Sequence, residues 1–120
     1  FKILMEATQL KLYVDDGSQP SRACMIFCEI NNINAEIIPI RLAKMDHKSP
    51  DFLKVNPIGQ VPALQDGDFF LQEGNAILKY IAVTRKVDDH WYPSCPKKRA
   101  KVDAVMDWHH CFLRPGAAPC

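Results

Sequence analysis

The order of apolar and polar positions along the chain predicts alternating strands and helices. Positions 10–14 alternate between strongly apolar and more polar residues, which is the two-residue period of a half-buried strand. Apolar residues then recur at helical spacing over 23–30, after Ser18, a residue type that favours a helix N-cap. A second strand is expected over 35–40, and Pro39 indicates that this strand is an edge or ends there.

A second set of shorter elements follows. They are a short helix around 51–55, a turn at 56–59, a strand over 61–64, a hairpin turn at Asp66-Gly67 and a returning strand over 69–71. A helix opened by Glu73-Gly74-Asn75 comes next, and its buried stripe consists of Ile77, Tyr80, Ile81 and Thr84. A strand–helix–strand unit is parallel and right-handed, whereas a hairpin is antiparallel. The expected fold class is therefore α/β, in the order β-α-β-α-β-β-α, with helices on both faces of a four-stranded mixed sheet.

The last third of the chain departs from this pattern. Between Lys86 and Pro96 there are two prolines and no period, which predicts a linker. A final helix from about Lys97 places Val105, Trp108 and Phe112 on one side, where they need a partner surface. Met5 is a more natural start than the first residue, and the chain is interpreted as a piece of a longer protein. We expect an N-terminal extension over 1–9, a first domain over 10–86, a linker over 87–96 and, over 97–120, the first helix of a truncated helical domain.

Composition and charge exclude several function classes. The 120 residues are 48% hydrophobic and 24% charged, which argues against disorder. The formal net charge is +1 and no basic block is present, so nucleic acid is disfavoured as a partner. No apolar run approaches the roughly 20 residues that span a bilayer, and no membrane partner is expected.

The cysteines and histidines do not form a metal or disulfide framework. There are five cysteines and no secretory signal, so we expect reduced thiols and a cytoplasmic location. Cys24 and Cys28 are one helical turn apart, which is better explained by packing than by a metal or redox pair. Consecutive helix positions such as His109-His110-Cys111 splay about 100° apart and rarely bind one ion.

The junction before the first helix is the most informative candidate site. Ser18-Gln19-Pro20-Ser21 has the spacing of a redox C-x-x-C motif, but serine cannot exchange disulfides. A serine hydroxyl at a helix N-terminus can donate a hydrogen bond to an anion. If the anion is a thiolate, lowering its pKa from about 8.5 to about 6.5 requires about 2.7 kcal/mol. One charge-assisted hydrogen bond supplies about 1.5–3 kcal/mol and the helix N-terminus about 0.3–1 kcal/mol. The alternative is a plain helix cap.

Two further junctions lie on the same rim of the expected sheet. A cis Val61-Pro62 bond would turn the backbone groups of Val61 outward, where a peptide-like ligand could pair with them as an added strand. The alternative is a trans proline that begins an ordinary strand. At Glu73-Gly74 a carboxylate and free N–H groups suit the ammonium and carboxylate of an amino acid. The alternative there is the ordinary preference of helix N-termini for acidic residues.

These residues carry a resemblance to a known family. The chain resembles the N-terminal, thioredoxin-like domain of glutathione transferases, and most closely the theta class, including its plant members. The segments that carry it are Leu12-Tyr13, Ser18 to Ala23, Asn56 to Leu64, Glu73 and Ala76 to Tyr80. Those that point to the theta class are His90 to Pro93, Arg99 to Lys101, Asp107 to His110 and Leu113-Arg114. The resemblance covers roughly residues 10 to 118.

The resemblance implies a set of roles. Glutathione would be the cosubstrate, without a metal, and the second substrate would be a hydrophobic electrophile or an organic hydroperoxide. Ser18 would hold the glutathione thiolate and Arg114 would assist its ionisation. The glutathione site would consist of Gln19, His47, Lys48, Gln60, Val61, Pro62, Glu73 and Gly74. Among these, His47 and Lys48 would face the glycyl carboxylate, Val61 the cysteinyl backbone and Glu73 the γ-glutamyl end. The full-length form is expected to be a homodimer.

Three departures from the family pattern leave two hypotheses open. Gly74 stands where the family usually has serine, which predicts weaker glutathione binding, by about 0.5–1.5 kcal/mol. Pro115 stands where a second arginine is common, and we expect it to end the helix early and misplace Arg114. The helical domain that builds most of the electrophile pocket is represented only by its first helix. The chain is therefore interpreted either as a transferase of theta type, weakly active or inactive alone, or as a non-catalytic thioredoxin-fold module for binding or assembly.

Overall fold

The computed structural model describes residues 9–117 of the chain. The chain divides into two compact units, one that ends at Arg85 and one that begins at Lys86, and each is described by itself. The N-terminal extension predicted over 1–9 lies outside the described residues except for Gln9.

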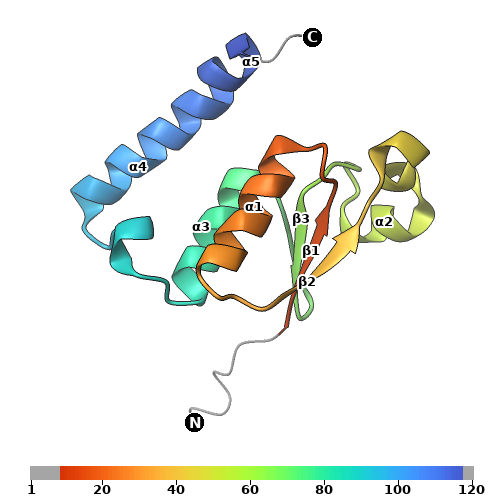
Figure 1. Ribbon diagram of the computed structural model, residues 1–120, viewed down its shortest axis with the longest axis horizontal. Coiled ribbons are helices and arrows are strands. Elements are labelled where there is room, and N and C mark those ends of the chain that lie inside the picture. The colour runs from red at the N-terminus through yellow and green to blue at the C-terminus, as the bar shows by residue number, and fades with distance from the viewer. Residues whose placement is uncertain (1–8, 118–120) are drawn as a thin grey trace. The chain divides into compact units, whose positions relative to one another are not determined.

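The first unit is built on one mixed sheet (Figure 1). Its strands are β1 (Leu10–Val14), β2 (Ala35–Pro39), β3 (Ala63–Asp66) and β4 (Phe69–Gln72), in the spatial order β2-β1-β3-β4. β1 pairs with β2 in parallel, and both the β1–β3 and β3–β4 pairs are antiparallel. The predicted four-stranded mixed sheet is confirmed, and β2 is an edge strand, in agreement with its proline.

Helices cover both faces of this sheet. Figure 1 shows α1 (Gln19–Ile30) and α3 (Gly74–Thr84) on one side and α2 (Pro50–Val55) on the other. The larger core lies under α1 and α3, and its buried members are Leu10, Leu12, Val14, Cys24, Cys28, Leu64, Ile77 and Ile81. The smaller core lies under α2 and contains Ile40, Phe52 and Ala63. The two-residue period of β1 thus sends alternate side chains to the larger core.

Two predicted boundaries in the β3–β4 hairpin are wrong by one or two residues. β3 begins at Ala63 rather than Val61, because Pro62 has no N–H to donate to a ladder. Asp66 pairs with Phe69, so the hairpin loop is Gly67-Asp68 rather than Asp66-Gly67. Gly67 has φ +65°, a conformation that glycine adopts without steric cost.

The buried cysteines of α1 are packing residues, as expected. Cys24 is fully buried and Cys28 is 4% exposed, and both belong to the larger core. Burial raises the pKa of the Cys24 thiol to about 12, and the neighbouring Cys28 adds to this effect. Burial also raises the pKa of Cys28, to about 11, against the opposing charge of Arg85.

The second unit is mainly one long helical segment. α4 (Pro96–Trp108) continues into a π-helical stretch, η5 (His109–Leu113), and then into α5 (Arg114–Ala117). The expectation that Pro115 ends the helix is therefore wrong. A proline in a helix clashes with the carbonyl four residues earlier, and the wider π turn directly before Pro115 accommodates it. Val105, Trp108 and Phe112 are each more than half exposed.

The predicted linker is partly ordered by its own contacts. A 3₁₀ turn, η4 (Asp89–Trp91), precedes Tyr92, whose hydroxyl donates to Asp103 over 3.0 Å. The Arg99 guanidinium lies 4.1 Å from the centre of the Tyr92 ring, and its Nε donates to the Pro93 carbonyl over 2.7 Å. These contacts fix the start of α4 against the segment before it.

A buried ion pair connects the hairpin of the first unit with the end of α3. The two guanidinium nitrogens of Arg85 donate to the two carboxylate oxygens of Asp66 over 3.1 and 3.2 Å, and the Tyr80 hydroxyl also donates to Asp66. The Asp66 and Arg85 side chains are only 7% and 12% exposed. Burial alone would raise the pKa of Asp66, but the hydrogen bonds from Arg85 and Tyr80 and the charge of Arg85 outweigh it and lower the pKa.

We expect Asp66→Asn to lower the free energy of unfolding by about 3 kcal/mol at neutral pH, because the substitution leaves the Arg85 charge buried and unpaired. Since the folded-state pKa of Asp66 is lowered, the contribution is present above its unfolded pKa and is lost as the pH falls through the folded value. Urea unfolding at neutral and acidic pH measures both effects. Asp68→Asn, at an exposed neighbouring position, is the matched control. Equal stability of the two variants at neutral pH would contradict this account.

Candidate functional site

Ser18 occupies the N-cap of α1. Its backbone is extended (φ −92°, ψ 120°), its Oγ accepts a hydrogen bond from the Ser21 N–H over 3.3 Å, and its own N–H donates to the Asp15 carbonyl over 2.9 Å. The plain-cap alternative therefore describes part of what Ser18 does. A hydroxyl that accepts in this way still has a proton to donate. The cap and an anion contact are compatible, and Gln19 follows as the exposed first residue of α1.

Val61 and Pro62 lie directly before β3. The peptide bond between them is cis, which was one of the two alternatives predicted. The ladder with β1 begins at the Tyr13–Ala63 pair, so Val61 is outside it. Within residues 9–117 no backbone hydrogen bond of Val61 is formed. An extended peptide could therefore pair with this residue.

Glu73 and Gly74 open α3. Glu73 has φ +78°, a region that side-chain-bearing residues rarely adopt, and its carboxylate makes no capping hydrogen bond. Such backbone outliers are concentrated at binding sites. The Glu73 side chain is exposed and its charge is available to a ligand.

The first turns of α1 and α3 approach each other closely at Gly74. A Cβ placed on Gly74 would lie 2.9 Å from the Pro20 Cβ and 3.8 Å from the Pro62 Cγ. The three junctions that the sequence singled out, at Ser18, Pro62 and Glu73, are thereby brought to one place. We call this group the sulfur cluster, after the glutathione sulfur that the resemblance implies it would hold. Its members are Ser18, Gln19, Val61, Pro62, Glu73 and Gly74.

A second group surrounds the turn before Val61. His47 and Lys48 belong to a 3₁₀ turn, η3 (Asp46–Lys48), and a Cβ on Gly59 would lie 3.0 Å from the His47 carbonyl oxygen and 3.3 Å from the Lys48 Nζ. The His47 Nδ1 is buried and has no hydrogen-bond partner among the described residues. We call His47, Lys48 and Gln60 the carboxylate cluster, after the glycyl carboxylate of glutathione that the resemblance implies would bind here. Gln60 is covalently continuous with Val61, so the two clusters lie side by side.

Asn56, which the sequence indicates only as part of a turn, has a structural role that the sequence pattern does not reveal. Asn56 is 1% exposed, its Nδ2 donates to the Gln60 carbonyl over 2.9 Å, and its Oδ1 accepts from the Ile58 N–H over 3.1 Å. The side chain therefore shapes the loop that presents Gln60 and Val61. An asparagine before proline at the end of a helix is a signal for such a turn.

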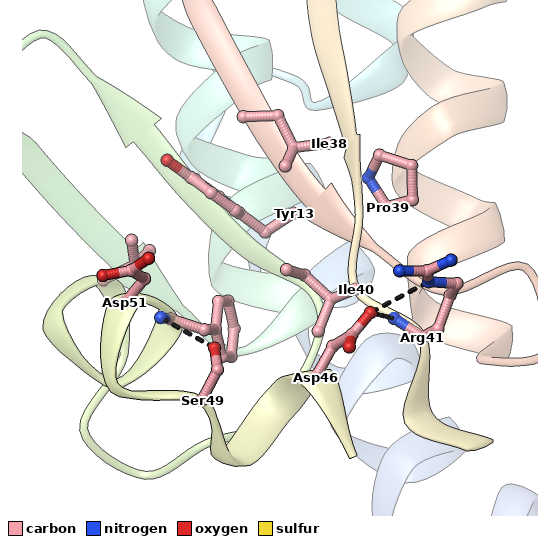
Figure 2. A pocket seen from close by; sticks show the side chains of 10 residues that line it. Tyr13, Ile38, Pro39, Ile40, Arg41, Asp46, Ser49 and Asp51 are labelled. Atoms are coloured by element: carbon pink, nitrogen blue, oxygen red, sulfur yellow. Dashed lines mark hydrogen bonds and ion pairs between the residues drawn. The ribbon is translucent and has the colours of Figure 1, made fainter. Parts of the chain in front are cut away.

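Arg114 belongs to the second unit, as the first residue of α5, and is described apart from both clusters. A different feature of the first unit is a hollow of about 390 Å³ beside α2 (Figure 2). Its floor includes Tyr13 and Phe52, whose ring centres are 5.8 Å apart. None of the sequence-predicted site residues lines this hollow.

Among residues 9–117, no helix is both long enough and apolar enough to span a bilayer. The same part of the chain contains no group of three or more His, Cys, Asp or Glu residues that could hold a metal ion.

The chain is similar to known proteins over most of its length. The family described as glutathione S-transferase, N-terminal domain, matches residues 8–83. The chain belongs to the glutathione S-transferase family. Glutathione S-transferase T1 of Arabidopsis thaliana is 50% identical over 111 residues, which cover 92% of this chain and 45% of that protein. Human glutathione S-transferase theta-2 is 46% identical over 105 residues, which cover 88% of this chain and 43% of that protein.

Solved structures of glutathione S-transferases agree with this assignment. Human glutathione S-transferase T1-1 in its apo form matches with a TM-score of 0.83 at 48% identity, over 88% of this chain and 44% of that chain. Human theta-2, solved with glutathione and an unknown ligand, matches with a TM-score of 0.82 at 46% identity, over 84% of this chain and 42% of that chain. The resemblance to the theta class and the thioredoxin-like fold are confirmed. The chain spans less than half the length of these curated relatives.

We expect Asn56→Ala to lower the free energy of unfolding by about 3 kcal/mol, because it removes the partners of the Ile58 N–H and the Gln60 carbonyl and leaves a cavity where the buried Asn56 side chain packs. Urea unfolding of the 120-residue chain measures the change. The exposed Asn34 offers a control, since Asn34→Ala should stay within about 0.5 kcal/mol of the parent. Comparable stability of the two variants would show that Asn56 does not organise the loop.

Proposed function

We propose that this chain is the glutathione-binding part of a theta-class glutathione S-transferase, and that it ionises the thiol of bound glutathione for attack on electrophiles. The observation that carries the proposal is the close approach of Gly74 to Pro20 and Pro62, which gathers the sulfur cluster at two helix N-termini. One relative, human theta-2, was solved with glutathione bound, which supports the same ligand here.

In this proposal Ser18 donates its hydroxyl proton to the thiolate. The N-cap bond from Ser21 occupies an acceptor position of the hydroxyl and orients it. A charge-assisted hydrogen bond and the N-terminus of α1 together supply about 2–4 kcal/mol, compared with the roughly 2.7 kcal/mol that lowers a thiol pKa from 8.5 to 6.5. Glutathione would then be ionised at neutral pH.

The charges of the two clusters suit the remaining groups of glutathione. The exposed Glu73 carboxylate would bind the γ-glutamyl ammonium, and the Gly74 N–H at the start of α3 would bind the γ-glutamyl carboxylate. The backbone of Val61 would pair with the cysteinyl residue. Lys48 and the buried His47 Nδ1, beside Gly59, would face the glycyl carboxylate.

The proposed chemistry is nucleophilic substitution. One solved relative, a human theta-class enzyme, was crystallised with the glutathione conjugate of 1-menaphthyl sulfate. We propose the same class of reaction here: the thiolate forms a carbon–sulfur bond, the carbon–oxygen bond breaks, and sulfate leaves with the electron pair. Reduction of organic hydroperoxides by the same thiolate is the second reaction that we propose.

Further elements of the proposal concern the whole protein. We propose that the segment after Lys86 begins the helical domain, that this domain supplies most of the electrophile pocket, and that the full-length protein is a cytoplasmic homodimer. The exposed apolar side chains of Val105, Trp108 and Phe112 support a covering partner for this segment. In the 120-residue chain we expect glutathione binding with little turnover.

We expect Ser18→Ala to raise the thiol pKa of glutathione bound to the 120-residue chain by about one to two units, because the hydrogen bond to the thiolate is lost. Titration of the thiolate's ultraviolet absorbance measures this pKa. Ser18→Thr keeps both the cap and the hydroxyl and should retain the parent value. In the full-length protein, turnover of 1-menaphthyl sulfate should fall about tenfold or more in the alanine variant. An unchanged thiol pKa in that variant would remove Ser18 from its proposed role.

We further propose that Arg114 assists the ionisation of the thiol in the full-length protein. Arg114→Ala should raise the thiol pKa of bound glutathione by about one unit, since a nearby cation favours the thiolate. Arg114→Lys keeps the charge and should restore most of the effect. Ultraviolet titration of all three proteins measures it, and identical curves would contradict the role.

A further inference from the structure

The carboxylate of Asp15 connects the two loops that carry the candidate glutathione-binding residues. Its Oδ1 accepts from the Gly17 N–H and its Oδ2 from the Leu42 N–H, each over 2.7 Å. Gly17 precedes Ser18 in the loop after β1, whereas Leu42 begins η2 (Leu42–Lys44), the 3₁₀ turn that leads to the carboxylate cluster. The two bonded residues are thus far apart in sequence.

The backbone of Asp15 holds the same loop. The Ser18 N–H donates to the Asp15 carbonyl over 2.9 Å, and the Asp15 N–H approaches the buried Ser21 Oγ at 3.4 Å. Asp15 therefore contacts both ends of the turn in which the Ser18 hydroxyl is oriented.

A second carboxylate extends the connection to the carboxylate cluster. Asp46 Oδ2 accepts from the Arg41 N–H and from its Nε, each over 3.0 Å, as the dashed lines in Figure 2 mark. Arg41 is the residue before Leu42, and Asp46 is the residue before His47. The bonds of Asp15 and Asp46 therefore run from the turn of Ser18 to the turn of His47.

Charge alone does not explain a carboxylate at Asp15. A negative group near a bound thiolate disfavours the thiolate by direct repulsion. The backbone hydrogen bonds from Leu42 and Gly17 lower the pKa of Asp15, so this carboxylate is ionised at neutral pH. Its contribution to the site has to come from geometry.

We propose that Asp15 is a positioning residue, which aims the Ser18 hydroxyl at the glutathione sulfur. It also holds the His47–Lys48 turn at the distance from Ser18 that fits the length of glutathione. This inference rests on the proposed function. Asp15 acts through Ser18 and through the backbone of Leu42, and it touches no ligand atom itself.

The neighbouring Asp16 provides a matched control for the charge. It is exposed, it is one residue closer to Ser18 in sequence, and within the described residues its carboxylate makes no hydrogen bond. Asp16→Asn removes one negative charge near the site and keeps the loop geometry. Asp15→Asn removes the same charge, and it replaces the acceptor that faces Leu42 or Gly17 by an NH₂ group.

The two variants should differ in their effect on the thiol pKa of bound glutathione. In Asp15→Asn, loss of the aimed hydroxyl should raise the thiol pKa by about one unit, a tenfold loss of acidity, and weaken glutathione binding severalfold. In Asp16→Asn, loss of a repelling charge should leave the thiol pKa unchanged or lower it slightly. Asp15→Glu keeps the charge but moves the carboxylate, and it should also raise the thiol pKa.

The experiment is ultraviolet titration of the thiolate, with calorimetric titration of glutathione, on the full 120-residue chain and its variants; circular dichroism verifies folding. A thiol pKa in folded Asp15→Asn or Asp15→Glu that equals or falls below the parent value would overturn the positioning role. If the parent chain binds glutathione and Ser18→Ala raises the thiol pKa, such a result counts against Asp15 alone. Failure of the parent chain to bind glutathione would overturn the proposed function and, with it, this inference.

Discussion

Two helix N-termini meet in this fold because residue 74 has no side chain. The first turn of α3 lies so close to Pro20 of α1 that a Cβ at Gly74 would be 2.9 Å from the Pro20 Cβ. Each N-terminus presents the positive end of a helix dipole. Their convergence favours negative charge at this corner, and the strand entrance at Pro62 forms its third side. The candidate site depends on this contact more than on any single charged residue.

The sequence predicted most elements of the first unit, because their signals are local. Ser18 caps α1 as expected, and the alternation in β1 identified which side chains enter the larger core. The β3–β4 hairpin was predicted, but the start of β3 and the position of the turn were misplaced. The effect of Pro62 on the start of β3 depends on β1, the strand that pairs with it from Ala63 onward. Pro115 was misjudged for a related reason. The clash of a proline with the preceding helical turn is relieved where that turn widens, as the π-helical stretch before Pro115 does.

The contacts that arrange the candidate site were less accessible to sequence reasoning. Five residues of the sulfur cluster were singled out from their types and spacing, and Gln19 from the family resemblance. Nothing local indicates that Asp15 bonds to the backbone of residue 42. Likewise Asn56 looked like an ordinary turn residue, although its amide holds the loop that ends at Gln60. Backbone donors have no sequence signature, so a carboxylate or amide that serves them is visible only once the loops are placed. The resemblance to glutathione transferases implies which residues would meet a ligand, whereas the structure adds what holds them.

Burial makes the thiols of Cys24 and Cys28 unreactive while the core is closed. Their pKa values of about 12 and about 11 leave almost no thiolate on either sulfur at neutral pH, and alkylating or oxidising reagents react with thiolates. Labelling at these two positions therefore requires that the core opens, and its rate measures the opening equilibrium of the α1–sheet interface. Mass spectrometry can separate these slow sites from the exposed Cys95 and Cys111 of the second unit. The two buried thiols therefore report transient opening of the core, because they do not react while the fold is closed.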